Sequence, residues 1–152
     1  MKRDRIYMLD TNILIFMLRG LKASDPSPQR VSAQRVRDQI VTHMNAGATV
    51  CVSAITICEL EYGAGKSQHP ERERKAVYKV LAPFVLLEFD PVSLPRHYGE
   101  IRNQLEKAGN SIGAMDLMIA AHALSIGATL ITNNTSEFER VPHLAVQDWS
   151  VG

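Results

Sequence analysis

The residues with the clearest chemical potential are three carboxylates that lie far apart in the chain. Asp10 ends the short apolar run 6–9. Glu59 follows the β-branched run 49–53, and Asp116 opens a strongly apolar segment. Acids at strand ends and helix starts of an α/β chain tend to converge on one cleft. Three carboxylates in one cleft repel one another unless a divalent cation lies between them. The pattern therefore predicts a metal-dependent enzyme.

Each of the three acids also has a purely structural interpretation. Asp10 could cap the N-terminus of the helix expected after it. Glu59 fits, with Thr56, the S/T-x-x-E pattern of a capping box. Asp116 would be favoured in the first turn of a helix by the positive end of the helix dipole. Taken singly, these acids leave both interpretations open, and the polar segment 134–137 is also interpreted as a helix cap followed by an acid.

Other familiar active-site chemistries find no support in the sequence. The five histidines include no pair spaced four residues apart, and none pairs with a serine or cysteine as a hydrolytic triad would require. No GxGxxG loop occurs, and Gly65-Lys66-Ser67 is not part of a GxxxxGK[ST] phosphate loop, because residue 60 is leucine and not glycine. The segment 63–66 follows a helical pattern and is interpreted as a helix stop. His122 lies on an apolar helix face and is expected to be a core residue.

Length and composition predict one soluble domain that spans residues 1–152. Hydrophobic residues make up 45% of the chain and charged residues 22%, as in ordinary globular proteins. The net charge is +1, so any contact with nucleic acid must depend on local basic patches. No apolar run reaches the roughly 18 residues of a membrane span, and the first run stops at Asp10. We therefore expect a cytoplasmic protein without a membrane partner.

Apolar periodicity and turn residues predict strands and helices in alternation. This order is typical of an α/β fold, and we expect a parallel sheet of four to five strands with helices on both faces. Ligands of such folds bind at the carboxyl ends of the strands, where Asp10 lies. Asp116 begins the helix that leads into the fourth strand, which would be the wrong edge unless the preceding loop carries it across. Strands are expected at 5–9, 49–53, 84–89, 129–132 and about 144–149. Helices are expected at 12–19, 28–46, 55–65, 71–81, 94–105, 114–126 and 135–139. Gly20 is expected to end the first helix, and Ser27 and Pro28 to start the second after a loop at 21–28.

The acids fall within four ordered motifs that together are far more specific than any one of them. These motifs are 8–13 (MLDTNI), 53–63 (SAIT followed by EL and Gly63), 112–120 (IGAMDLMIA) and 132–138 (TNN with Phe138). The joint pattern resembles that of PIN-domain ribonucleases, and the chain is similar to the VapC-type toxins of bacterial type II toxin–antitoxin pairs. The resemblance extends from about residue 6 to 150 and implies a PIN-like α/β domain.

The resemblance implies hydrolysis of RNA phosphodiesters with Mg²⁺, for which Mn²⁺ could substitute. Asp10 and Asp116 would be the nearest metal ligands. Glu59 would hold a metal-bound water or a second metal and help to remove a proton. The supporting residues would be Thr11, Asn12, Thr132 and Asn134, of which Thr11 and Asn12 position the first Asp and the phosphate. Asn134 stands where many relatives have Asp, which makes the expected charge of the site −3 before metal binds.

The resemblance also implies partners. We expect a cognate antitoxin, an RNA substrate with tRNA as the favoured class, a homodimer, and contact with DNA only indirectly through the antitoxin. The toxin would inhibit translation until the antitoxin neutralises it. Two alternatives stay open: a PIN-like module that acts mainly by binding a protein partner, and a phosphatase that uses Asp10 as nucleophile. The phosphatase would want a second Asp two residues later, where this chain has Asn12. The segment 21–47 is longer than in shorter members of the family.

Overall fold

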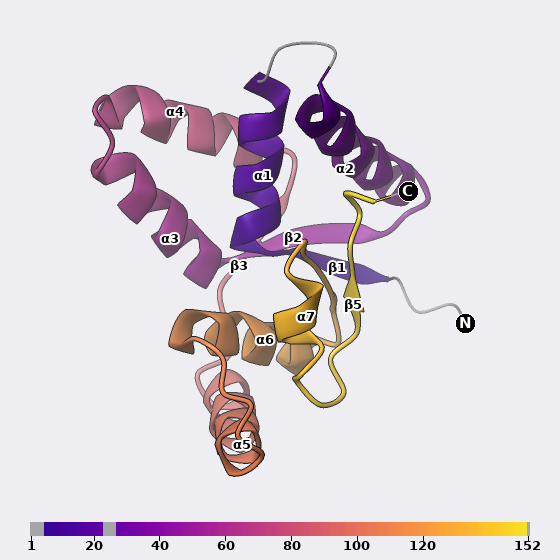
Figure 1. The fold of residues 1–152 in the computed structure, drawn as a ribbon, viewed down its shortest axis with the longest axis vertical. Helices are drawn as coiled ribbons and strands as arrows, with labels where there is room; N and C mark the ends of the chain where they lie inside the picture. The colour runs from indigo at the N-terminus through magenta and orange to yellow at the C-terminus, as the bar shows by residue number, and fades with distance from the viewer. Residues whose placement is uncertain (1–4, 23–26, 152) are drawn as a thin grey trace.

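A five-stranded parallel sheet forms the centre of the molecule (Figure 1). The computed structural model describes residues 5–22 and 27–151. The strand order is β3-β2-β1-β4-β5, and every neighbouring pair is parallel. The strands are β1 (Ile6–Leu9), β2 (Thr49–Ser53), β3 (Val85–Leu87), β4 (Thr129–Ile131) and β5 (Val146–Gln147). The predicted α/β class and parallel sheet are therefore confirmed, with β3 and β5 shorter than expected.

Helices cover both faces of the sheet, as predicted. Figure 1 shows α1, α2 and α4 on one side of the sheet and α5 and α6 on the other. Because side chains alternate along a strand, the side chains of β1 pack into two separate hydrophobic clusters, one on each face of the sheet. Met8 packs with α5 and α6, whereas Tyr7 and Leu9 pack with α1, α2 and α4. The helices are α1 (Thr11–Lys22), α2 (Pro28–Asn45), α3 (Ala54–Gly65), α4 (Pro70–Leu81), α5 (Ser93–Lys107), α6 (Ala114–Ile126) and α7 (Thr135–Phe138).

The direction of α6 brings Asp116 to the carboxyl edge of the sheet. Each of the first three crossovers between consecutive strands contains a pair of helices, and α6 is the second of its pair. Because α6 leads into the start of β4, it runs antiparallel to the strands, and its first turn lies at their carboxyl ends. The sequence left open whether the loop before Asp116 carries it to this edge, and the structure shows that it does. A helix that feeds a parallel strand starts at the edge where that strand ends.

Gly20 lies inside α1, and the predicted helix end at this position is wrong. The helix continues to Lys22 and packs closely against α2. A Cβ atom at Gly20 would lie 2.5 Å from Ala33 Cβ and 2.8 Å from the backbone oxygen of Gln29. Glycine is therefore needed here for the close approach of two helices and not for a left-handed helix end.

The start of α2 agrees with its local sequence signal. The Ser27 hydroxyl accepts a hydrogen bond from the backbone N–H of Arg30 at 3.1 Å, and Pro28 is the first helical residue. The expected loop 21–28 is too long, because 21 and 22 belong to α1 and Pro28 begins α2, whereas 23–26 lie outside the described residues. Within the described part of the chain, no helix is long and apolar enough to cross a membrane.

Candidate active site

Asp10 is held at the carboxyl end of β1 with one carboxylate oxygen bonded and the other free. The residue is fully buried. Its backbone N–H donates to the carbonyl of Ile131 in β4 at 2.9 Å, and the Thr132 hydroxyl donates to Asp10 Oδ2 at 2.7 Å. Asp10 Oδ1 is buried and has no hydrogen-bond partner among the described residues. A buried oxygen without a partner is costly, and a cation at this position would satisfy it.

Burial makes Asp10 hard to ionise. Its pKa is raised from 3.8 to about 6, chiefly by loss of hydration and to a smaller extent by the nearby charge of Glu59. The Thr132 hydroxyl and the backbone amides of Thr11 and Asn12 favour the ionised form and oppose this rise. Since burial outweighs these donors, the carboxylate would gain from a positive charge placed beside it.

Glu59 is turned toward α1 and does not cap its own helix. The Thr11 hydroxyl donates to Glu59 Oε1 at 2.7 Å and lies 3.1 Å from the hydroxyl of Thr56. The N-cap of α3 is Ser53, whose hydroxyl accepts from the backbone N–H of Ile55 at 3.1 Å. The capping-box interpretation of Glu59 is therefore wrong. Thr11 directly follows Asp10 in the chain, and its hydroxyl instead holds the Glu59 carboxylate near Asp10.

Asp116 joins the other acids from the first turn of α6. Its pKa is raised from 3.8 to about 7, first by burial, then by a hydrogen bond with Glu137, and then by the charges of Glu137, Asp10 and Glu59. Because the charges of Glu137, Asp10 and Glu59 all act on Asp116, these acids lie near one another in one site. The structure therefore brings the three predicted carboxylates together, including the one whose position the sequence left open.

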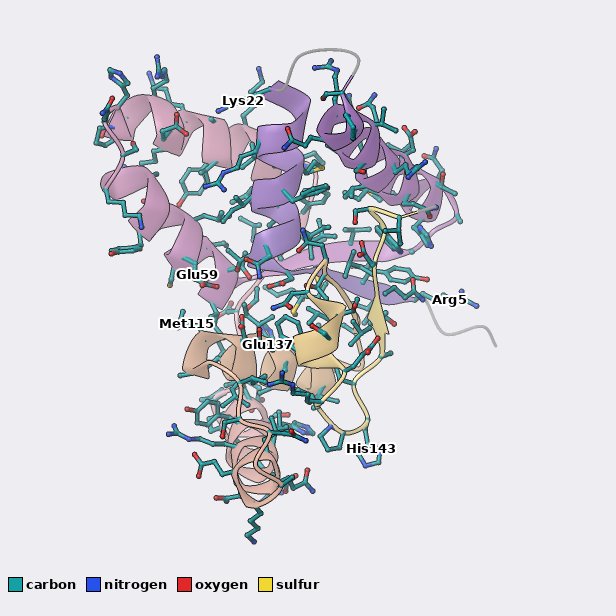
Figure 2. All side chains as sticks on the ribbon, viewed as in Figure 1. Arg5, Lys22, Glu59, Met115, Glu137 and His143 are labelled. Carbon is teal, nitrogen blue, oxygen red and sulfur yellow. The ribbon has the colours of Figure 1, made fainter. Side chains whose placement is uncertain are left out.

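Glu137 is a fourth acid of the site that sequence reasoning missed. It lies in α7 and shares a hydrogen bond with Asp116. The side-chain amide of Asn134 donates to Glu137 Oε2 at 2.6 Å, and the backbone N–H of Gly113 approaches Glu137 Oε1 at 3.4 Å. Figure 2 shows labelled Glu59, Met115 and Glu137 where α3, α6 and α7 meet. The available signal was an acid in the first turn after β4.

This fourth acid changes the expected charge and the expected role of Asn134. The four carboxylates carry a formal charge of −4 when all are ionised, and not the −3 expected from the sequence. The side chain of Asn134 makes no capping bond to α7 and is occupied with Glu137. Its backbone N–H donates to the Thr132 hydroxyl at 3.0 Å, so Thr132 links Asn134 to Asp10. Asn134 therefore orients Glu137, and Glu137 is the fourth acidic residue of the site.

A buried histidine connects two of the elements that carry the acids. His122 of α6 is fully buried, and its Nδ1 lies 2.7 Å from the hydroxyl of Ser53 at the start of α3. Burial lowers the pKa of His122 below its usual value of 6.5. The expected core position of His122 is confirmed, but its Nε2 has no hydrogen-bond partner among the described residues, and the expectation that no histidine pairs with a serine is wrong for this buried contact. The contact fixes the start of α3, which bears Glu59, against α6, which bears Asp116.

The donor set suits a hard divalent cation. All four candidate side chains offer oxygen ligands, which Mg²⁺ prefers. Within residues 5–22 and 27–151, no three His, Cys, Asp or Glu side chains already stand at the spacing of a closed metal site. Mg²⁺ does not require such a cluster, because it keeps several waters and is commonly held by one or two carboxylates. The free Asp10 Oδ1 and the nearby Asp116 meet that lower requirement.

The raised pKa of Asp10 predicts a pH-dependent effect of removing its charge. The folded state holds the Asp10 proton more tightly than the unfolded state, so its stabilising effect is complete below about pH 4 and is lost as pH rises through about 6. In chelator, the stability gained by Asp10→Asn over the wild type should grow by about 1 kcal/mol from pH 5 to pH 8. Urea unfolding of both proteins at both pH values measures this difference in the free energy of unfolding. The contribution of His122 cancels, because both proteins contain this residue.

The exposed acid Asp38 of α2 provides the matched control for this measurement. Asp38→Asn should change the free energy of unfolding by the same small amount at both pH values. A difference between Asp10→Asn and the wild type that stays constant from pH 5 to pH 8 would contradict the raised pKa of Asp10.

Comparison with known proteins places this site in a family context. The family model for the PIN domain matches residues 7–144. The chain is 40% identical to the tRNA(fMet)-specific endonuclease VapC of Shigella flexneri, over 95% of this chain and 98% of that protein. It is 39% identical to ribonuclease VapC2 of Haemophilus influenzae, over 94% and 97% of the two chains. The structure matches DNA-bound VapBC from Salmonella typhimurium with a TM-score of 0.79 at 35% identity, covering 95% of this chain and 98% of that one.

Proposed function

Because the chain belongs to the PIN-domain family and to the VapC-type proteins within it, we propose that it is a metal-dependent endoribonuclease and the toxin of a toxin–antitoxin pair. The observation that carries the proposal is the group of carboxylates at the carboxyl edge of the sheet, with Asp10 buried and its Oδ1 free. Such a site suits the hydrolysis of a negatively charged phosphodiester, provided that a cation offsets the charge of the acids.

The side chains have separate roles in this proposal. Asp10 and Asp116 would hold Mg²⁺ or Mn²⁺, and Thr132 fixes Asp10 through its Oδ2. Such a cation, when bound, would supply Lewis-acid activation of water and of the phosphate. Glu59 accepts a proton from the attacking water, in an orientation set by the Thr11 hydroxyl.

Glu137 and Asn12 complete the arrangement. Glu137, held by Asn134, is hydrogen-bonded to Asp116 and adds a further carboxylate to the site. The side chain of Asn12 is exposed at the start of α1, where it can donate to a phosphate oxygen. No step requires a covalent intermediate on the protein, which distinguishes this mechanism from that of a phosphatase with Asp10 as nucleophile.

We further propose tRNA as the substrate class and a cognate antitoxin as the partner. The Shigella relative is named as specific for tRNA(fMet), and the matched structures include VapBC complexes from Salmonella typhimurium and nontypeable Haemophilus influenzae. The Salmonella complex is bound to DNA. In the proposed cycle the toxin acts in the cytoplasm as a homodimer, cleaves tRNA and inhibits translation. The antitoxin neutralises it and supplies any contact with DNA.

The chemistry of the RNA ends tests the proposed function. The purified chain, incubated with total tRNA and Mg²⁺, should produce internal cuts with a 5′-phosphate and a 3′-hydroxyl, because the attacking group is water. Sequencing with adapters that require each type of end identifies both the site and the chemistry. Ends with a 2′,3′-cyclic phosphate would argue for attack by the ribose hydroxyl. Hydrolysis of p-nitrophenyl phosphate without RNA cleavage would favour the phosphatase.

A further inference from the structure

A groove of about 670 Å³ extends from the acid site between α1, α3 and α4. It shares Thr11, Asn12 and Glu59 with the site, so the two are continuous. Figure 2 shows Glu59 on the part of α3 nearer the sheet and Lys22 at the far end of α1. The groove therefore leads from the carboxylates outward along two diverging helices. The proposed mechanism uses only its inner end.

Tyr62 is an unusually exposed aromatic residue in the wall of this groove. Glu59, Tyr62 and Lys66 are spaced by three and four residues, so they lie on one face of α3 and its C-cap. Tyr62 is 70% exposed, the highest value among the large hydrophobic side chains of the described residues. The Lys66 ammonium lies 5.0 Å from the centre of the Tyr62 ring. The ring is therefore partly covered by a cation, and the rest of its exposed surface lies about one helical turn from Glu59.

Gly63 gives the same wall a bare stretch of backbone. It lies in the last turn of α3, which ends at Gly65 within the predicted helix stop 63–66. A Cβ at Gly63 would meet no atom of the described residues within 4 Å. Glycine inside a helix costs about 1 kcal/mol relative to alanine, and neither packing nor a positive φ explains it here. A close approach by a ligand would explain it.

The opposite wall of the groove carries positive charge. Arg19 and Lys22 of α1 are exposed and line the groove, and Lys66 faces them from α3. The one acid of the lining outside the active site is Glu73 of α4. Outside the acid site, the lining therefore holds three cations and one acid. Exposed cations beside an aromatic ring are the combination that binds single-stranded nucleic acid.

We propose that this groove binds the RNA strand next to the scissile phosphate, with a base stacked on Tyr62 over the backbone of Gly63. Arg19 and Lys66 then pair with the phosphates on either side of that base. The inference rests on the proposed function and adds to it the residues that position the substrate. Stacking on an aromatic ring does not depend on base identity, so the groove supplies affinity and register while the acids supply the reaction.

Replacing Tyr62 tests the stacking contact. Tyr62→Ala should raise KM for cleavage of total tRNA about tenfold while kcat stays within about twofold, because the contact exists before and during the reaction. Tyr62→Phe should restore KM to within about twofold of the wild type, because the ring is retained. The matched control is Tyr78→Ala on α4: this tyrosine is 40% exposed but lies outside the groove, and its loss should leave both constants within about twofold.

Replacing Gly63 separates substrate contact from folding. Gly63→Ala should raise the melting temperature, because alanine favours the helix and the added methyl group meets no protein atom. The same variant should raise KM about fivefold, because that methyl group occupies the space of the base. Gly99→Ala in the middle of α5 also adds a methyl group in open space, outside the groove, and should raise the melting temperature without changing KM.

The outcomes distinguish this inference from the function on which it rests. Absence of RNA cleavage and RNA binding by the wild type would overturn both. Cleavage by the wild type with an unchanged KM in Tyr62→Ala and Gly63→Ala would overturn the groove assignment alone. Unchanged RNA kinetics together with loss of inhibition by a co-expressed antitoxin would also overturn it, and would identify the groove as a surface for the protein partner.

Discussion

Asp10→Asn is expected to lower the rate of RNA cleavage by at least roughly a thousandfold while the protein stays folded. Asparagine has nearly the same shape as aspartate and can still accept the hydrogen bond from Thr132 through its side-chain oxygen. What it loses is the negative charge at the most buried acid of the site. A cation held by one fewer charge binds more weakly, and whatever remains bound cannot be placed against the fixed Oδ1. Cleavage of total tRNA under single-turnover conditions measures the loss.

Unfolding is not the expected cause of that loss. Because burial raises the pKa of Asp10 to about 6, the metal-free variant should be at least as stable as the wild type at pH 8. Asp116→Asn should lose activity to a similar degree, whereas Asp38→Asn on the exposed face of α2 should keep it. Full activity in purified Asp10→Asn or Asp116→Asn would refute the assignment of these acids.

Much of the fold follows from local sequence patterns. The β-branched and apolar runs, separated by amphipathic segments, predicted the parallel sheet and both helical layers. The Ser27 cap was predictable because capping depends only on residues a few positions away. Gly20 was not, because its reason is the approach of α2, which no local pattern encodes.

The candidate site was predictable in its motifs but not in its contacts. Thr56 and Glu59 match a capping box, yet Ser53 already provides the N-cap and Thr11 of another helix binds Glu59. Glu137 looked like an ordinary first-turn acid, since its role depends on Asp116 and Asn134. In both cases a tertiary contact decides between two interpretations that are locally equivalent. Carboxylates near the ends of parallel strands therefore need the direction of each flanking helix before their convergence can be judged.

Removal of divalent cations is expected to stop cleavage and to remove a large part of the stability at pH 8. With four carboxylates at one edge and the pKa values of Asp10 and Asp116 raised to about 6 and about 7, the metal-free site at pH 8 holds repelling charges. A cation offsets them, so Mg²⁺ at a hundred times its dissociation constant should stabilise the fold by about 2.7 kcal/mol. At pH 5 protons compete for the same oxygens, and the stabilisation should be much smaller.

Cleavage and thermal unfolding in EDTA, and after addition of Mg²⁺ or Mn²⁺, measure these effects together. Both cations should restore cleavage, and the rise in melting temperature on adding Mg²⁺ should be larger at pH 8 than at pH 5. The comparison with Asp10→Asn makes the test specific to this site: the variant should show little of that rise, because it lacks the free carboxylate oxygen. Undiminished cleavage in chelator would contradict a metal-dependent mechanism. A rise in melting temperature that survives in Asp10→Asn would place the cation elsewhere on the protein.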